Sequence, residues 1–167
     1  MREPLDGVTW TRLPGTVPEG VSGMAKEDIF YLGVKILIVN REGRILLLLR
    51  SPSGTKGWDI REGREFWDVP GGRIQRGEDI AEALRRELYE ETGLQIDDRD
   101  FQFAGYHVSS ARIPVGEADA GLILFVHKCK WDLVPEVRLS PEHSNLCWAT
   151  PEEAGRALQG HIPPSFF

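Results

Sequence analysis

Apolar residues cluster in strand-length blocks over most of the chain. Tyr31–Val39 and Arg44–Arg50 are rich in Val, Ile and Leu, and the turn-forming residues between them predict two adjacent strands. Phe66–Val69 predicts a short third strand, while Phe101–Ser109 and Gly121–Trp131 predict two more. The spread of these blocks predicts a sheet built from both halves of the chain.

Two other segments carry the signals of helices. Glu78–Thr92 has apolar residues at helical spacing and is followed by Gly93, which fits a left-handed helix cap. Thr150, Pro151 and Glu153 supply the N-cap, the first position and the capping box of a short second helix. Strands combined with two such helices predict a mixed sheet covered by helices.

Composition divides the chain into three parts. Residues 1–29 are dense in Pro and Gly, which predicts an N-terminal arm that is partly disordered or laid over the surface. Residues 30–160 carry all the predicted strands and helices and form the predicted domain. Residues 161–167 form a C-terminal tail that ends in Phe166-Phe167. The arm and this apolar tail are the candidate contacts of a homodimer.

The overall composition narrows the class of protein without naming an activity. The chain has 167 residues, a formal net charge of −6 and a hydrophobic fraction of 41%, which is typical of one globular domain. The acidic balance argues against a stable nucleic-acid partner, which a basic face would bind. No apolar run approaches the roughly 20 residues that span a bilayer, and no secretory leader is expected. Two cysteines and no zinc-type spacing favour a reduced, cytoplasmic setting.

The predicted helix at 78–92 places acidic residues on its inward face. On a helical wheel, Ile80 and Leu84 define that face, with Leu88 at its edge. Glu87 and Glu91 fall on the same stripe. We therefore expect both carboxylates to point toward the protein interior.

These two acids, flanked by Glu90, form an energetically costly set. The three carboxylates lie one to four residues apart in the last turns of the helix, where the helix dipole is already negative. Burial adds the cost of desolvation. Arg86 can compensate one carboxylate but not three, so a solvated helix laced with salt bridges, the alternative interpretation, fits poorly. Hard oxygen ligands of this kind favour Mg²⁺ or Mn²⁺.

The spacing of residues around this helix resembles a known motif. The segment is similar to the Nudix box, and the chain resembles the Nudix hydrolase family at every fixed position of Gly72-x5-Glu78-x7-Arg86-Glu87-Leu88-x-Glu90-Glu91-x-Gly93. The resemblance implies an α+β fold of the Nudix type, in which a mixed β-sheet is sandwiched between helices. It also implies hydrolysis of a nucleoside diphosphate linked to another group, with divalent metal and water.

The resemblance assigns roles to the acids of the motif. Glu87 and Glu91 would be the principal ligands of Mg²⁺ or Mn²⁺, and Glu90 would be a further ligand or a base that activates water. The backbone carbonyl of Gly71 would complete the metal shell. Gly71 and Gly72 have a physical reason of their own, because residues without a side chain let the main chain pass close to metal and phosphate.

Further residues of the expected site lie around these ligands. Glu78 would pair with Arg86 and so orient the acidic side chains. Glu142 resembles an additional acid that several branches of the family use, although it could equally be a surface residue of a loop. Glu117 is the second candidate for that acid.

The nature of the substrate is not encoded in the motif. The marks that distinguish ADP-ribose hydrolases and dinucleoside polyphosphate hydrolases are absent at their usual offsets, where Ser109 and Ser110 stand. Aromatic side chains can stack on a base and arginines can bind phosphates. The candidate substrate-binding residues are Arg50, Trp67, Arg73 and Tyr106.

The sequence thus predicts a metal-dependent pyrophosphohydrolase of a nucleoside triphosphate, ADP-ribose or a nucleotide sugar. The alternative from another class is a catalytically silent Nudix module that senses a nucleotide and regulates a partner. An isomerase of isoprenoid diphosphates would need a catalytic cysteine, and neither Cys129 nor Cys147 stands in a suitable setting.

Overall fold

A computed structural model describes residues 28–52, 64–116, 118–131, 137–159 and 162–167. Most of the predicted arm, residues 1–27, lies outside these ranges, as does Glu117. The elements run in the order β1 (Phe30–Val39), β2 (Ile45–Arg50), β3 (Phe66–Asp68), α1 (Ile80–Thr92), η2 (Asp98–Asp100), β4 (Gln102–Val115), β5 (Ala118–Lys130), β6 (His143–Ala149), α2 (Pro151–Ala157) and η3 (Pro164–Phe166).

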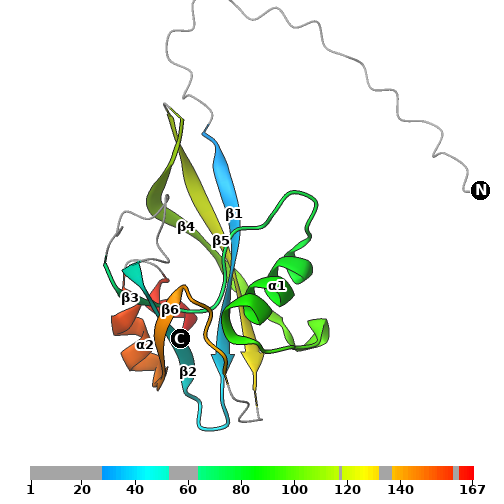
Figure 1. Cartoon of the computed structure of the whole chain (residues 1–167), viewed down its shortest axis with the longest axis vertical. Helices are drawn as coiled ribbons and strands as arrows, with labels where there is room; N and C mark the ends of the chain where they lie inside the picture. The colour runs from blue at the N-terminus through cyan, green and yellow to red at the C-terminus, as the bar shows by residue number, and fades with distance from the viewer. Residues whose placement is uncertain (1–27, 53–63, 117, 132–136, 160–161) are drawn as a thin grey trace, which may run out of the picture.

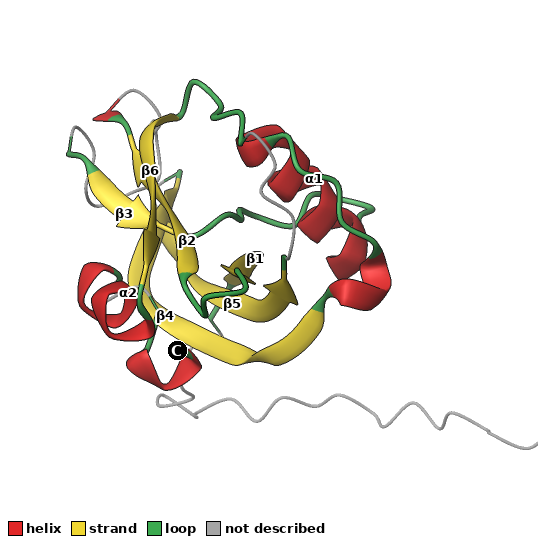
Figure 2. Cartoon of the chain, turned by 90° about the horizontal axis from the view of Figure 1, so that it is seen from below, coloured by secondary structure: helices red, strands yellow, loops and turns green. Residues whose placement is uncertain are grey.

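The strands form one mixed sheet with helices on both faces (Figures 1 and 2). The strand order is β3-β2-β1-β5-β4, and β6 pairs with β2 outside this path. Only the β1–β5 pair is parallel among these neighbours. In Figure 2 the sheet lies between α1 and α2. The predicted mixed sheet sandwiched between helices, an α+β fold, is confirmed.

Burial on both faces explains the continuous apolar run of β1. Val34 and Ile36 belong to the core cluster that α1 covers, through Leu84 and Leu88. Leu37 points the other way, into the cluster that α2 covers. A strand that is covered on both sides cannot alternate between apolar and polar residues, because neither face meets water.

The sheet opens between β1 and β2, and a glycine-containing segment enters the opening. β1 meets β2 only through the pair of Val39 and Ile45. Farther along β1, the amides of Val34 and Ile36 donate to the carbonyls of Gly72 and Pro70 at 2.8 and 2.9 Å. The chain that leads from β3 to α1 is therefore held against β1 as an additional, irregular strand.

The long helix begins and packs slightly differently from the prediction. α1 starts at Ile80 rather than Glu78, because Asp79 is the N-cap and forms a capping box with Glu82. Leu88 is fully buried, whereas Ile80 is 37% exposed. The helix contacts the sheet through its middle and C-terminal turns, so the first turn projects past the core. Gly93 caps the helix at φ 71°, as expected.

The strands at the far end of the sheet also depart from prediction. The segment predicted at 101–109 continues to Val115 as β4, paired with β5 across two irregularities in register. β6 was not predicted as a strand, because its polar residues hide the alternation. It forms by pairing with β2 along its whole length. Within the described ranges, no helix combines the length and apolar character required to cross a membrane.

Replacing Leu88 with alanine tests the packing of α1 on the sheet. Because Leu88 is wholly buried, we expect Leu88→Ala to lower the free energy of unfolding by about 2–5 kcal/mol, measured by urea denaturation. Tyr89→Ala, on the exposed side of the same helix, is the control and should cost far less. Equal losses for the two variants would contradict the packing described here.

Candidate functional site

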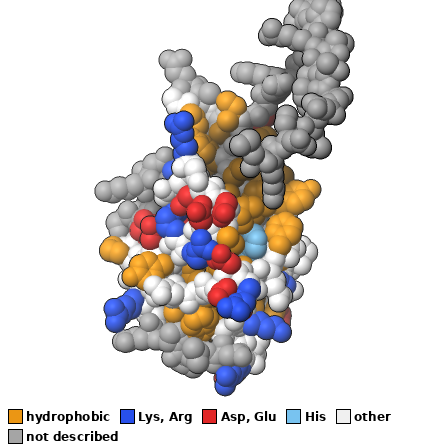
Figure 3. All heavy atoms as spheres, turned by 90° about the vertical axis from the view of Figure 1, so that its right-hand side faces the viewer, with side chains coloured by type: hydrophobic (Ala, Val, Ile, Leu, Met, Phe, Trp, Pro, Cys, Tyr) orange, Lys and Arg blue, Asp and Glu red, His pale blue; other side chains and the backbone are white. Residues whose placement is uncertain are grey.

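An open hollow of about 260 Å³ brings most of the predicted site residues together. Four parts of the chain contribute to it: the end of β2, the glycine segment before α1, the last turns of α1, and the residue before β6. Figure 3 shows acidic side chains grouped around arginines on the face of the molecule that α1 occupies. The residues that line the hollow are Arg50, Gly71, Gly72, Arg73, Gln75, Arg86, Glu87, Glu90, Glu91 and Glu142.

Glu91 is the most deeply buried acid of this site. Only 5% of the residue is exposed, and its carboxylate accepts a hydrogen bond of 2.8 Å from the amide of Gly71. Arg50 Nη1 and His143 Nε2 lie 3.9 and 3.8 Å from the other carboxylate oxygen. Burial raises the pKa of Glu91 to about 8, although the nearby cations and the Gly71 amide oppose this rise.

Glu87 lies in the tightest part of the site. A side chain on Gly72 would collide with it, since a Cβ there would fall 2.6 Å from the carboxyl carbon of Glu87. A Cβ on Gly71, whose φ is +138°, would stand 2.1 Å from the carbonyl oxygen of Val34. Gly71 is therefore required by its backbone conformation and by the close approach of the chain to β1, whereas a side chain at Gly72 would displace the carboxylate of Glu87. Burial also raises the pKa of Glu87.

Arg86 is the hub of the ion pairs on this face. Its guanidinium binds Glu78 through two hydrogen bonds, at 2.5 and 2.9 Å. Another nitrogen, Nη1, lies 2.7 Å from Glu87 and 3.2 Å from Glu90. The paired guanidinium lowers the pKa of Glu78 to about 2. The structure thus brings together the predicted pair and shows that the same arginine also restrains two acids of the motif.

Arg50 connects the two sides of the hollow. Its Nη2 atom lies 2.6 Å from the carboxylate of Glu142, and its Nη1 atom approaches Glu91. Glu142, with 53% of its side chain exposed, immediately precedes β6 and faces α1 across the opening. The guanidinium of Arg50 is itself buried, so it anchors two acids that are distant in the sequence.

Two buried residues near this site were not predicted. Lys35, on β1, forms an ion pair of 2.7 Å with Asp68, and both side chains are 8% exposed. A single lysine within an apolar strand was the signal that could have identified it, because a buried ammonium needs a partner.

His143 is a further buried residue near this site that the sequence did not predict. It lies at the start of β6, buried beside Glu91. Its ring nitrogen Nδ1 is 3.1 Å from the hydroxyl of Ser140. Burial, together with Arg50, lowers the pKa of His143 to about 4.

The four predicted substrate-binding residues are not all at the hollow. Arg50 and Arg73 line it, and the guanidinium of Arg73 also stacks 5.1 Å from the ring centre of Tyr31. Trp67 packs against the core on the α2 side of the sheet. Tyr106 lies on β4 and is 66% exposed. Neither Trp67 nor Tyr106 lines the hollow, so stacking by these rings on a base stays a prediction.

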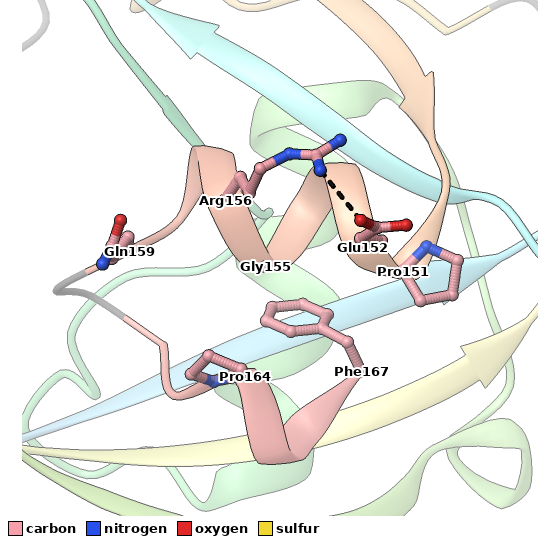
Figure 4. A pocket seen from close by; sticks show the side chains of 7 residues that line it. All are labelled: Pro151, Glu152, Gly155, Arg156, Gln159, Pro164 and Phe167. Carbon is pink, nitrogen blue, oxygen red and sulfur yellow. Dashed lines mark hydrogen bonds and ion pairs between the residues drawn. The ribbon is translucent and has the colours of Figure 1, made fainter.

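A second hollow lies on the other side of the molecule, between α2 and the C-terminal segment (Figure 4). It measures about 410 Å³ and is lined by Pro151, Glu152, Gly155, Arg156, Gln159, Pro164 and Phe167. Its one acidic side chain, Glu152, is 2.9 Å from Arg156. Among the described residues that line it there is no second carboxylate, so this hollow lacks the paired acids of the acidic site.

The acidic site has the donor chemistry of a divalent-cation site. Two carboxylates with raised pKa values and main-chain oxygens form a hard oxygen set. Arg86 stands between Glu87 and Glu90. Within the described part of the chain, no three His, Cys, Asp or Glu side chains converge closely enough to enclose an ion. Entry of a cation would therefore require the carboxylates of Glu87 and Glu90 to turn from Arg86.

Comparison with known proteins places this geometry in context. A family model described as the NUDIX domain matches residues 30–165. A "MutT-like protein" from Streptomyces ambofaciens is 26% identical over 122 residues, covering 73% of this chain and 65% of its own length. An "RNA pyrophosphohydrolase" from Aeromonas hydrophila is 31% identical over 113 residues, covering 66% of this chain and 58% of its own. The chain thus spans somewhat less than two thirds of these curated relatives.

A solved structure shows the same arrangement of elements. The MutT protein from Methanosarcina mazei Go1 superposes with a TM-score of 0.60 at 29% sequence identity. The match covers 86% of this chain and 91% of that protein. The similarity therefore extends over the sheet and both helices rather than over the acidic motif alone.

The burial of Glu91 predicts that the free energy of unfolding of the protein depends on pH. Because its folded-state pKa lies near 8 and the ordinary value is 4.5, the folded protein holds a proton that the unfolded chain has released. Stability is therefore lost as pH rises through this interval. We expect Glu91→Gln to raise the free energy of unfolding at pH 8.5 by on the order of 2 kcal/mol, and to change it little at pH 5.

Urea denaturation in EDTA at the two pH values measures this difference. Glu82→Gln is the control, because Glu82 lies at the exposed start of α1 and glutamine also supports a capping box. If the difference in the free energy of unfolding between Glu91→Gln and wild type is the same at pH 5 and pH 8.5, burial does not raise the pKa of Glu91.

Proposed function

The chain belongs to the Nudix family, and we propose that it is a metal-dependent pyrophosphohydrolase that cleaves a nucleoside diphosphate linked to another group. One observation carries the proposal. Glu91 and Glu87, both with raised pKa values, lie against the Gly71-Gly72 main chain in an open hollow that three arginines also line. Acids buried beside an opening are expensive unless a cation binds them.

Glu87, Glu91 and the carbonyl of Gly71 would hold Mg²⁺ or Mn²⁺, with Glu90 at the solvent edge. Nudix hydrolases generally use divalent metals. When bound, such a cation supplies positive charge that neutralises the diphosphate and makes water more acidic. The protein's own contribution is the placement of acids that would otherwise repel one another.

Arg86 would control that placement as a positioning residue. Its guanidinium pairs with Glu87 and Glu90, while Glu78 holds it from the other side. The bidentate pair with Glu78 keeps Arg86 in place when the two acids turn away. Arg86 thus lowers the cost of having three carboxylates in one helical segment before a cation arrives.

Glu142 would accept a proton from the attacking water on the side opposite α1. It reaches the hollow from a different part of the chain, and Arg50 holds its carboxylate. Since half of its side chain is exposed, water can reach it. Arg50 and Arg73 would bind phosphate oxygens of the substrate. Trp67 or Tyr106 would stack on the nucleobase only if the substrate extended out of the hollow or the chain moved.

The substrate class is a nucleotide with a phosphoric anhydride bond. Nucleoside triphosphates, ADP-ribose and nucleotide sugars satisfy this chemistry. The relatives named RNA pyrophosphohydrolase add the 5′-triphosphate end of RNA to the compounds worth testing. Binding would then be confined to the terminal phosphates, in keeping with the net charge of −6.

The test is turnover on a substrate panel with and without metal. The purified chain is incubated in Mg²⁺ or Mn²⁺ with the compounds above, dinucleoside polyphosphates and a 5′-triphosphate oligonucleotide, and released phosphate or monophosphate is measured. We expect turnover on one class, its loss in EDTA, and a fall of at least ~100-fold in Glu91→Gln. Glu82→Gln is the matched control on the same helix and should retain wild-type turnover.

The possible failures of this test have distinct meanings. Hydrolysis that persists in EDTA would contradict metal dependence. Tight binding of a nucleotide without turnover in either metal would favour a sensing module instead of an enzyme.

Substitution of Glu142 separates proton transfer from metal binding. Because Glu142 lies across the hollow from α1, we expect Glu142→Gln to lower kcat by about 10²–10⁴-fold and to leave the affinity for Mn²⁺ within a few fold of wild type. Steady-state kinetics and a Mn²⁺ titration by electron paramagnetic resonance measure the two effects. Wild-type kcat in this variant would remove Glu142 from the reaction.

A further inference from the structure

The ammonium of Lys35 is completely satisfied in the interior of the protein. Besides the ion pair with Asp68 at 2.7 Å, Lys35 Nζ lies 3.3 Å from the carbonyl oxygens of both Val69 and Gly71. These three acceptors match the three protons of an ammonium group. Asp68 is fixed in turn, because its other oxygen accepts from the amide of Val69 at 2.8 Å.

The carbonyls of the segment before α1 alternate between two partners. Those of Pro70 and Gly72 accept from the amides of β1, at Ile36 and Val34. The carbonyls that alternate with these, of Val69 and Gly71, instead accept from Lys35 Nζ, at 3.3 Å each. Lys35 stands between Val34 and Ile36 on the same strand. Main-chain amides of β1 therefore hold one set of these carbonyls, and a side chain of β1 holds the other.

Gly71 is the residue of this segment whose conformation depends most on these contacts. Its φ of +138° is open to glycine and to few other residues, and glycine has the largest conformational freedom to lose. Its amide is held by Glu91. Without Lys35, the carbonyl side of the same residue would have no fixed partner among the described residues.

We propose that Lys35, with Asp68 as its counter-ion, is a positioning residue that fixes the direction of the Gly71 carbonyl and so prepares the oxygen set for a divalent cation. The inference rests on the proposed function, in which that carbonyl is a ligand. A carbonyl oxygen has two lone pairs, so a contact with Lys35 leaves a second one for a cation. The ammonium thus holds the carbonyl oxygen of a residue that lines the hollow.

The competing explanation is that Lys35 and Asp68 form a buried ion pair of structural importance alone. Removing one partner of such a pair leaves an isolated buried charge and destabilises the fold, whereas removing both often does not. The combined variant Lys35→Met with Asp68→Asn therefore separates the two explanations. It leaves neither member of the Lys35–Asp68 pair as an isolated charge, yet it lacks the ammonium that holds Gly71.

The experiment compares this combined variant with wild type and with a control pair. Circular dichroism and thermal unfolding first establish that it folds, and Arg112→Met with Asp28→Asn removes an exposed ion pair on the same sheet as the control. We expect the Kd for Mn²⁺, from electron paramagnetic resonance, to weaken by about 10–100-fold in the combined variant, with kcat falling more than KM rises. The control pair should leave both unchanged.

Hydrogen exchange at Gly71 supplies a readout that needs neither metal nor turnover. We expect the Gly71 amide to exchange faster in the combined variant than in wild type, while the amides of Val34 and Ile36 keep their protection. Unchanged exchange at Gly71, or faster exchange with wild-type Mn²⁺ affinity, would overturn the inference. A wild-type protein that binds no Mn²⁺ through Glu91 would instead refute the proposed function, and with it the role given to Lys35.

Discussion

The burial of one carboxylate, that of Glu91, is the constraint around which this site is organised. An acid in a low-dielectric environment pays a desolvation cost that grows when other acids stand nearby. The protein compensates with an amide from Gly71 and with two cations, Lys35 on β1 and Arg50 on β2. These groups reduce the cost without abolishing it, since the pKa of Glu91 remains near 8.

The fold supplies this environment by opening its own sheet. Where β1 and β2 separate, the segment from Pro70 to Gly72 lies against β1 and places its main chain beneath the last turns of α1. Those turns hold the acids at the end of the helix where the dipole disfavours them. The placement of these acids therefore costs stability, as is common at functional sites.

Two arginines compensate the other acidic side chains of the site. Arg86 is shared among Glu78, Glu87 and Glu90, so that the acids of the motif are neutralised while no cation is bound. Arg50 performs the same task between Glu91 and Glu142. The two arginines thus reduce the uncompensated negative charge of the acids around the hollow.

The sequence alone determined what depends on short-range patterns. The strand blocks and the helix with its inward glutamates follow from periodicity, whereas the Glu78–Arg86 pair follows from the resemblance to the Nudix box. The structure contains these elements and this ion pair. The tertiary structure decided which distant residues meet: Lys35 with Asp68, and Arg50 with Glu142 and His143 near Glu91. It also decided that β6 is a strand and that Tyr106 lies away from the hollow. Such contacts depend on strand order and register across the sheet, and periodicity along a single chain carries no information about which strands become neighbours.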